Sequence, residues 1–246
     1  AYIDGSTTKH INAQTASYNT TDSKWKFATT YYWPAVTQTI NFFAYLPANF
    51  SDNKISFGIS SNGRNPSIIC SGLPTTSDLS ALACAYAEGQ TRAANSAGVN
   101  LKFIRPFAEI TLKVSRSHPH LTLKSVTFNS VKTSGTGTIS YNSGAPSCSW
   151  STTDATSNYS VTVEREFTSS SSYPVTIGSY VVRPQSFTGN IQSITIEATW
   201  AGQTSYTKTF DTTVNLSSWD PGCKYTYSID LGDTDESINL SVSVSD

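Results

Sequence analysis

Charge is scarce in this sequence, since only 13% of its 246 residues are Asp, Glu, Lys or Arg and the formal net charge is -1. A globular domain usually has about 25% charged residues. A near-neutral chain has no electrostatic footprint for nucleic-acid phosphates, and this one has no Lys/Arg run suited to a membrane surface. Disorder is also disfavoured, because it requires low hydrophobicity together with high net charge. We therefore expect a folded protein with no nucleic-acid partner.

Methionine and long apolar runs are both absent. The sequence contains no Met, and we expect a processed or trimmed chain whose signal segment was removed before residue 1. No apolar stretch approaches the roughly 20 residues that a membrane-spanning helix needs. Aromatic residues nevertheless make up 12% of the chain, and this share indicates a packed core.

Catalytic and metal-binding motifs are missing as well. The sequence has no G-x-S-x-G nucleophile turn, no H-E-x-x-H helix and no Walker loop. His118 and His120 lie at a predicted turn without a neighbouring Cys or carboxylate, so we interpret them as part of a solvated loop. Glu164 and Glu166 share one face of a predicted strand, and the arginine between them favours a solvated face over a glycosidase acid pair. We expect no enzymatic activity, no metal site and no cofactor.

Four cysteines are present, and none forms a C-x-x-C pair. Their spacing therefore disfavours a zinc or redox motif. An even number of cysteines in a chain rich in Ser and Thr suits an oxidising compartment. We predict one disulfide between Cys70 and Cys84 and a second between Cys148 and Cys223. The alternative is four buried thiols, because unpaired cysteine is often buried.

Short runs rich in Val, Ile, Thr, Tyr and Phe recur between clusters of Gly, Pro, Asn and Ser, which is typical of β-strands. Strands are predicted at Thr39–Leu46, Lys54–Ile59, Ile110–Val114, Leu121–Val131, Tyr159–Glu166, Val175–Val182, Ile191–Trp200, Tyr225–Leu231 and Ile238–Val244. This density of strands indicates sandwiches or barrels. The exception is Ser77–Thr91, where Leu79, Leu82 and Ala83 have helical spacing and predict a short helical insert.

A domain boundary is predicted near residues 95–99, after the helical segment and before a new series of strands. It divides the chain into an N-terminal domain, 1–98, and a C-terminal domain, 99–246. Each part is long enough to bury its own core. We therefore predict an all-β protein with two tandem β-sandwich domains and a short helical insert.

Aromatic residues cluster early in the chain, at Trp25 and 31–33. A flat aromatic surface is one way to bind sugars, so a secreted carbohydrate-binding β-sandwich module is the alternative function. We favour core packing for Tyr32, Trp33, Phe43 and Tyr45. Phe43 and Tyr45 are two residues apart on a predicted strand and so share one face.

Four blocks of the sequence combine aromatic residues with proline, glycine or alternating aliphatic residues. They are Tyr31–Pro34 with Ile40–Pro47 (YYWP, INFFAYLP), Thr75–Ala85 (TTSDLSALACA), Val99–Val114 (VNLKFIRPFAEITLKV) and Trp219–Leu231 (WDPGCKYTYSIDL). Together and in this order they resemble the fimbrillin family, the fimbrial subunit lipoproteins of Bacteroides-type bacteria. Trp219 and Tyr225 of the last block join the predicted core aromatics. The chain departs from the family pattern at Arg105-Pro106, often His-Ala, and at Cys223, commonly Lys.

The resemblance implies two tandem transthyretin-like β-sandwich domains. It also implies a lipoprotein precursor, an extracytoplasmic location at the outer membrane and cell surface, and assembly with other fimbrial subunits, self or related. Family members include stalk subunits, anchors and adhesive tips, so host or bacterial surface ligands are further expected partners. In the family, removal of an N-terminal strand opens a groove that a strand from a neighbouring subunit fills.

The last predicted strand suits this mechanism on its own residues. Ile238, Leu240, Val242 and Val244 alternate strictly with small polar residues, so one face of the strand is suited to burial. Such a strand can be donated to another chain by β-augmentation, and these four residues form the candidate donor strand. The alternative is an ordinary final strand that packs on its own domain.

Overall fold

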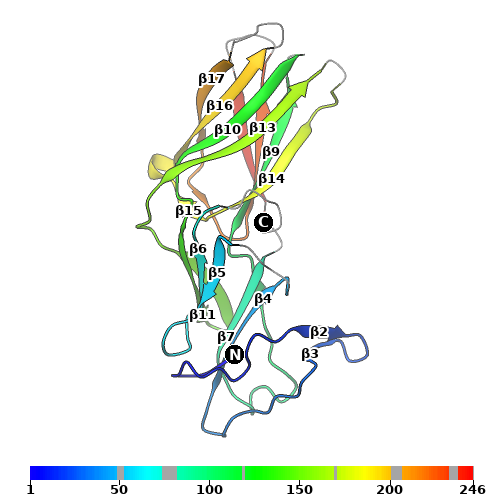
Figure 1. Ribbon diagram of the computed structural model, residues 1–246, viewed down its shortest axis with the longest axis vertical. Coiled ribbons are helices and arrows are strands. Elements are labelled where there is room, and N and C mark those ends of the chain that lie inside the picture. The colour runs from blue at the N-terminus through cyan, green and yellow to red at the C-terminus, as the bar shows by residue number, and fades with distance from the viewer. Residues whose placement is uncertain are drawn as a thin grey trace. The chain divides into compact units, whose positions relative to one another are not determined.

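The computed structural model describes residues 1–48, 53–73, 82–117, 120–168, 171–200, 207–232 and 238–245. Apart from one 3-10 turn, Thr188–Asn190, the regular structure in these ranges is β-strand (Figure 1). The protein is therefore all-β, as predicted.

The chain folds into two compact units. The first contains Ala1–Ile69, Ala81–Arg105 and Thr136–Ser149, and the second contains Cys70–Ser80, Pro106–Gly135 and Trp150–Asp246. The single boundary predicted at residue 98 would place 99–246 in one domain. In the structure the chain instead returns to the first unit at 136–149, because these residues form a hairpin there.

The first unit is a sandwich of two four-stranded sheets. One sheet has the order β1 (Tyr2–Ile3), β4 (Ile40–Leu46), β7 (Ala83–Gln90), β8 (Phe103–Ile104). The other has the order β12 (Ala145–Trp150), β11 (Gly135–Asn142), β6 (Ser67–Cys70), β5 (Ile55–Gly58). A separate hairpin consists of β2 (Ala16–Asn19) and β3 (Lys24–Phe27).

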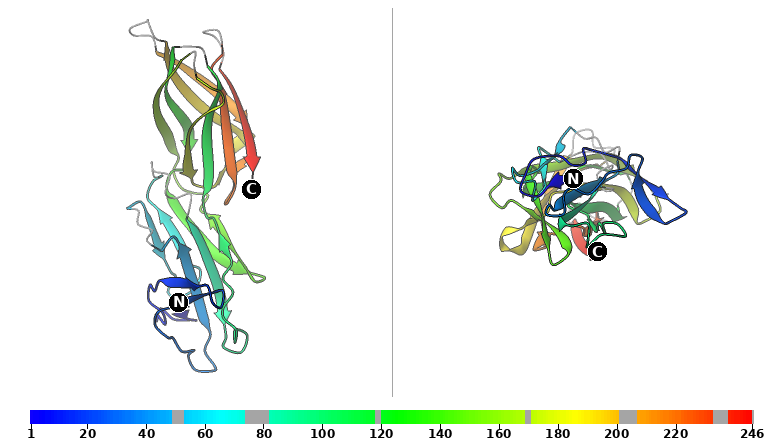
Figure 2. Two further views of the ribbon diagram at one scale, coloured as in Figure 1. Left: turned by 90° about the vertical axis from the view of Figure 1, so that its right-hand side faces the viewer. Right: turned by 90° about the horizontal axis from the view of Figure 1, so that it is seen from below.

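The second unit has the same two-sheet plan. Its sheets have the orders β13 (Ser157–Phe167), β10 (Leu121–Val131), β16 (Ile191–Trp200), β17 (Thr207–Asn215) and β14 (Val175–Val182), β9 (Ala108–Arg116), β19 (Lys224–Asp230), β20 (Asn239–Ser245). Two short strands, β15 (Gln185–Ser186) and β18 (Ser218–Trp219), form an additional pair. Figure 2 shows β20, in red, at the edge of its sheet.

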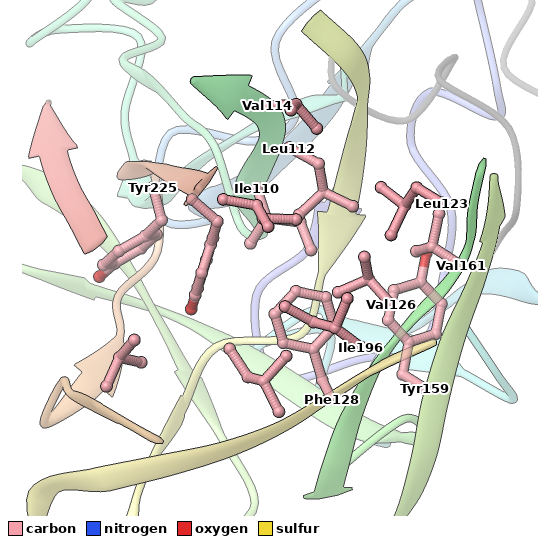
Figure 3. Packing of buried hydrophobic residues seen from close by; sticks show 14 of the residues in the cluster. Ile110, Leu112, Val114, Leu123, Val126, Phe128, Tyr159, Val161, Ile196 and Tyr225 are labelled. Carbon is pink, nitrogen blue, oxygen red and sulfur yellow. The ribbon is translucent and has the colours of Figure 1, made fainter. Parts of the chain in front are cut away.

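Alternating aliphatic residues build the core of the second unit (Figure 3). Ile110, Leu112 and Val114 of β9 are fully buried, whereas the polar residues between them are half-buried. Phe128 of β10 lies at the centre, with its ring 5.6 Å from that of Trp219 and 5.2 Å from that of Tyr227. The period of two seen in the sequence therefore corresponds to one inward face on each strand.

The predicted helical insert is wrong over the part of it that the structure describes. Residues 83–90 form strand β7, which pairs with β4 on one side and β8 on the other. The helical prediction rested on the spacing of Leu79, Leu82 and Ala83, and such a local pattern is a weak prior that strand pairing overrides. The first part of the segment, 77–81, lies outside the described residues.

Candidate assembly site

Strand β4 of the first unit has one side without a strand partner over most of its length. Its neighbour β1 pairs only with Ile40 and Asn41, whereas β7 pairs with β4 as far as Leu46. Within the described ranges, no strand lies beside 42–46 on the side opposite β7. An unpaired strand edge presents N–H and C=O groups that can pair with another chain.

Aromatic side chains line the interior of the sandwich at this edge. Phe43 and Tyr45 of β4 face Phe57 of β5, the edge strand of the opposite sheet. The ring centroids of Tyr45 and Phe57 are 4.6 Å apart in a stacked arrangement, and those of Phe43 and Phe57 are 5.6 Å apart. All three side chains are half-buried. Among the described residues, β4 and the edge strand β5 thus border a side of the sandwich that retains accessible apolar surface.

An ion-pair network holds the segment that follows β1. Arg64 donates two hydrogen bonds of 2.6 Å to the Asp4 carboxylate, and its third nitrogen lies 3.2 Å from Glu88 Oε1. Asn41 Nδ2 also donates to Asp4, at 2.8 Å. The hydrogen bonds from Arg64 hold the pKa of Asp4 well below its usual range. This network anchors the start of the chain at the end of β4 where β1 pairs.

The candidate donor strand is an edge strand of the second unit. β20 pairs antiparallel with β19 over seven positions, from Asn239 opposite Asp230 to Ser245 opposite Lys224. Ile238, Leu240 and Val242 are partly buried against the core, and Val244 is 53% exposed. The strand therefore packs on its own unit here, and none of these four side chains is fully buried.

The predicted core aromatics divide into three groups. Trp219 and Tyr225 are fully buried, with exposed fractions of 1% and 2%. Trp33 is half-buried against Phe42, with ring centroids 6.1 Å apart. Tyr32 is 81% exposed, and its prediction as a core residue is wrong. Its segment, 28–39, lacks regular secondary structure, so no strand alternation directs its ring inward.

The early aromatic cluster does not form one flat surface. Trp25 is 64% exposed on β3 and packs against Tyr18 of β2, with rings inclined at 59°. Tyr31 packs edge-on against Phe27 instead. Neither Tyr18 nor Phe57 stands out in the sequence, and the only local signal is that each is an aromatic residue within a short strand-like run.

All four cysteines are in the thiol form, so the structure contains neither predicted bridge. Cys84 and Cys148 belong to the first unit and Cys223 belongs to the second, whereas Cys70 is the last residue of β6 and lies at the boundary between the two units. The predicted Cys148–Cys223 pair thus takes one member from each unit, and the predicted Cys70–Cys84 pair takes its members from strands of two different sheets. Sequence spacing could not reveal this, because strand pairing sends residues close in sequence to different parts of the fold.

Titratable side chains do not gather into a metal site among the described residues. No group of three or more His, Cys, Asp or Glu side chains lies together there. Glu164 pairs with Lys124 at 2.6 Å and is exposed, as is Glu166, which lies 3.7 Å from His120 Nδ1. His118 lies outside the described ranges.

In the described part of the chain, no helix has the length and hydropathy needed to cross a membrane.

Solved structures of low sequence identity share the fold. A fimbrial protein from Bacteroides vulgatus superposes with a TM-score of 0.59 at 15% identity, covering 96% of this chain and 85% of its own. A protein proposed to act in cell adhesion, from Bacteroides uniformis, gives a TM-score of 0.51 at 16% identity, covering 90% and 79%. A similar protein from Bacteroides ovatus gives 0.53 at 14% identity, covering 91% and 75%.

Sequence comparison places the chain in a family. A search of curated proteins found no match. The family model described as fimbrillin-like matches residues 2–246, which is nearly the whole chain. The predicted resemblance is therefore confirmed, and the chain belongs to the fimbrillin-like family.

Proposed function

We propose that this protein is a structural or adhesive subunit of a bacterial surface fimbria and that subunits join by β-strand donation. Family membership supports the fimbrial role, and with it a location at the cell surface and partners among other fimbrial subunits. The observation that carries the assembly mechanism is the unpaired edge of β4 beside the half-buried rings of Phe43, Tyr45 and Phe57.

An incoming strand satisfies two needs at this edge. It pairs with the backbone groups of 42–46 that β1 leaves uncovered, and its apolar face covers the aromatic rings. Burying an exposed aliphatic side chain completely contributes roughly 1.5–3 kcal/mol. Two or three such residues contribute about 3–9 kcal/mol, and the backbone hydrogen bonds add to this sum against the cost of association.

β20 is the donor candidate because of its position and pattern. As an edge strand it pairs with a single neighbour, β19, so its release breaks one ladder of hydrogen bonds. On the acceptor, residues 42–46 offer five positions for a new ladder, against the seven that β20 pairs with β19. The Val244 side chain is more than half exposed on its own unit and becomes more buried when the strand is donated to the acceptor. Donation therefore exchanges one set of backbone hydrogen bonds for another and buries additional apolar surface.

Deletion of Ile238–Asp246 tests this mechanism. We expect the truncated protein to stay folded, because the four apolar residues of the segment are only partly buried, and to lose polymer formation. Circular dichroism reports the fold, and electron microscopy of purified protein reports fibres. Fibres from the truncated chain would show that another segment is the donor, and an unfolded monomer would show that β20 is an obligatory core strand.

An adhesive role for the β2–β3 hairpin is the second candidate function. Trp25 and Tyr18 are 64% and 51% exposed on adjacent strands, and aromatic faces stack on sugar rings. Glycan-array binding by the wild-type protein that disappears in Trp25→Ala would support it, whereas unchanged binding would exclude these rings.

A further inference from the structure

Cys84 lies at the centre of one sheet of the first unit. On β7 it stands opposite Tyr45 of β4 and opposite Ile104 of β8, and its side chain is fully buried. Tyr86 is two residues further along and therefore points from the same face of the sheet. The Tyr86 ring packs edge-on against Tyr141 of β11, with centroids 6.1 Å apart. The face that carries Cys84 is thus directed at the opposite sheet of the sandwich.

Cys148 lies on that opposite sheet, on β12 beside β11. The two strands are joined by a two-residue turn, Ser143-Gly144, whose φ angles are 51° and 79°. Positive φ at both central residues is the signature of a tight antiparallel hairpin. Counting back from the turn, Cys148 stands opposite Ile139, which is fully buried. Directly opposed residues share a face, so Cys148 also points into the sandwich.

The two cysteines lie at equivalent positions around the Tyr86–Tyr141 contact. Cys84 is two residues from Tyr86 on β7. Ile139, which stands opposite Cys148, is two residues from Tyr141 on β11. Each cysteine is therefore one inward-facing position away from the tyrosine of its own sheet. Burial raises the pKa of both thiols to about 12, and the proximity of Cys148 contributes to the rise at Cys84. Cys70, at the end of β6, instead donates to Gly72 O and Thr133 O.

We propose that Cys84 and Cys148 form a disulfide that links the two sheets of the first unit in the mature protein. Each thiol gives up its proton, one Sγ–Sγ bond forms, and two electrons pass to a disulfide-bearing oxidant whose own S–S bond is reduced to two thiols. Exchange of this kind proceeds through a mixed disulfide. Extracytoplasmic compartments permit such bonds to form and persist.

The chemistry of the buried thiols determines when the bond forms. The thiolate is the attacking species, and a thiol with a pKa of about 12 supplies almost none at neutral pH. Oxidation therefore takes place while the chain folds, before both side chains are enclosed. Once formed, the bond links the two sheets to which β4 and β5 belong and so fixes their separation.

Refolding in a glutathione redox buffer, followed by alkylation and peptide mapping, tests the proposal. We expect a linked peptide pair containing Cys84 and Cys148, lighter by two hydrogen atoms than the reduced pair. Reduction should lower the melting temperature on the order of 10 °C, because the bond closes a long loop. Cys223→Ser is the matched control in the second unit, and it should still give the linked peptide pair and the fall in melting temperature on reduction. Cys84→Ser should give neither.

Two outcomes would overturn the proposal. One is complete alkylation of Cys84 and Cys148 after oxidative refolding to the native circular dichroism spectrum. The other is a linked peptide that joins either cysteine to Cys70 or Cys223. Both are read on the wild-type chain, so neither depends on whether a variant folds.

Discussion

A substitution at Val244 can distinguish an effect on the stability of the monomer from an effect on the proposed assembly of subunits. Its side chain is 53% exposed at the end of β20, on the same strand face as Leu240 and Val242, which are partly buried. A donated strand would place all three against the aromatic rings of the acceptor. Substituting Val244 therefore changes little in the isolated subunit and much in the proposed contact.

The magnitudes for Val244→Asp follow from this difference. In the monomer the new carboxylate stays in water, so we expect the free energy of unfolding to fall by about 1 kcal/mol or less. In the acceptor an unpaired carboxylate enters an apolar site, which costs about 3–5 kcal/mol. Since 1.4 kcal/mol corresponds to tenfold in an equilibrium constant, the subunit contact should weaken by at least about a hundredfold.

The assay pairs two measurements on one preparation. Denaturant unfolding gives the stability of the monomer, and sedimentation with electron microscopy gives the extent of polymerisation. Ser243→Asp is the matched control, because Ser243 is exposed on the opposite face of the same strand and stays in water in both states. If Val244→Asp polymerises as well as this control, then Val244 is not buried on assembly and donation of β20 is excluded.

Three further predictions concern the stability of the two units. Phe128→Ala should lower the free energy of unfolding by about 3–5 kcal/mol, because the ring is fully buried; a loss under 1 kcal/mol in denaturant melts would contradict the packing. Asp154→Ala should cost about 3 kcal/mol, because it leaves the buried Arg183 guanidinium without the carboxylate 2.7 Å away, and an unchanged denaturation midpoint would rule this out. Arg64 lowers the pKa of Asp4 in the folded state, so this pair stabilises fully above about pH 4, the ordinary carboxyl pKa, and loses its effect as the pH falls further. The difference in unfolding free energy between wild type and Asp4→Asn should then shrink in acid, and a constant difference would exclude the ion pair as its source.

Local alternation of apolar and polar residues determines most of the strands. The predicted strand Leu121–Val131 coincides with β10, and Val175–Val182 and Ile191–Trp200 coincide with β14 and β16. Buried and more exposed residues alternate along β10 and β16, and only an extended chain places every second residue on one buried face. The all-β class and the family resemblance follow from the same local patterns.

The features on which the proposed function depends arise from the tertiary structure. The alanine-rich stretch at 83–90 became β7 because β4 and β8 pair with it from both sides. Tyr32 is exposed and Phe43 half-buried, although both were predicted to pack in the core, because only Phe43 lies on a strand of the sandwich. In the described part of the chain, the edge of β4 stays unpaired because β1 pairs with only Ile40 and Asn41. Cys84 and Cys148 lie on strands of two different sheets of the first unit. Pairings between residues far apart in the sequence leave no local periodicity, so the sequence alone could not reveal the strand order or the sheet on which each cysteine lies.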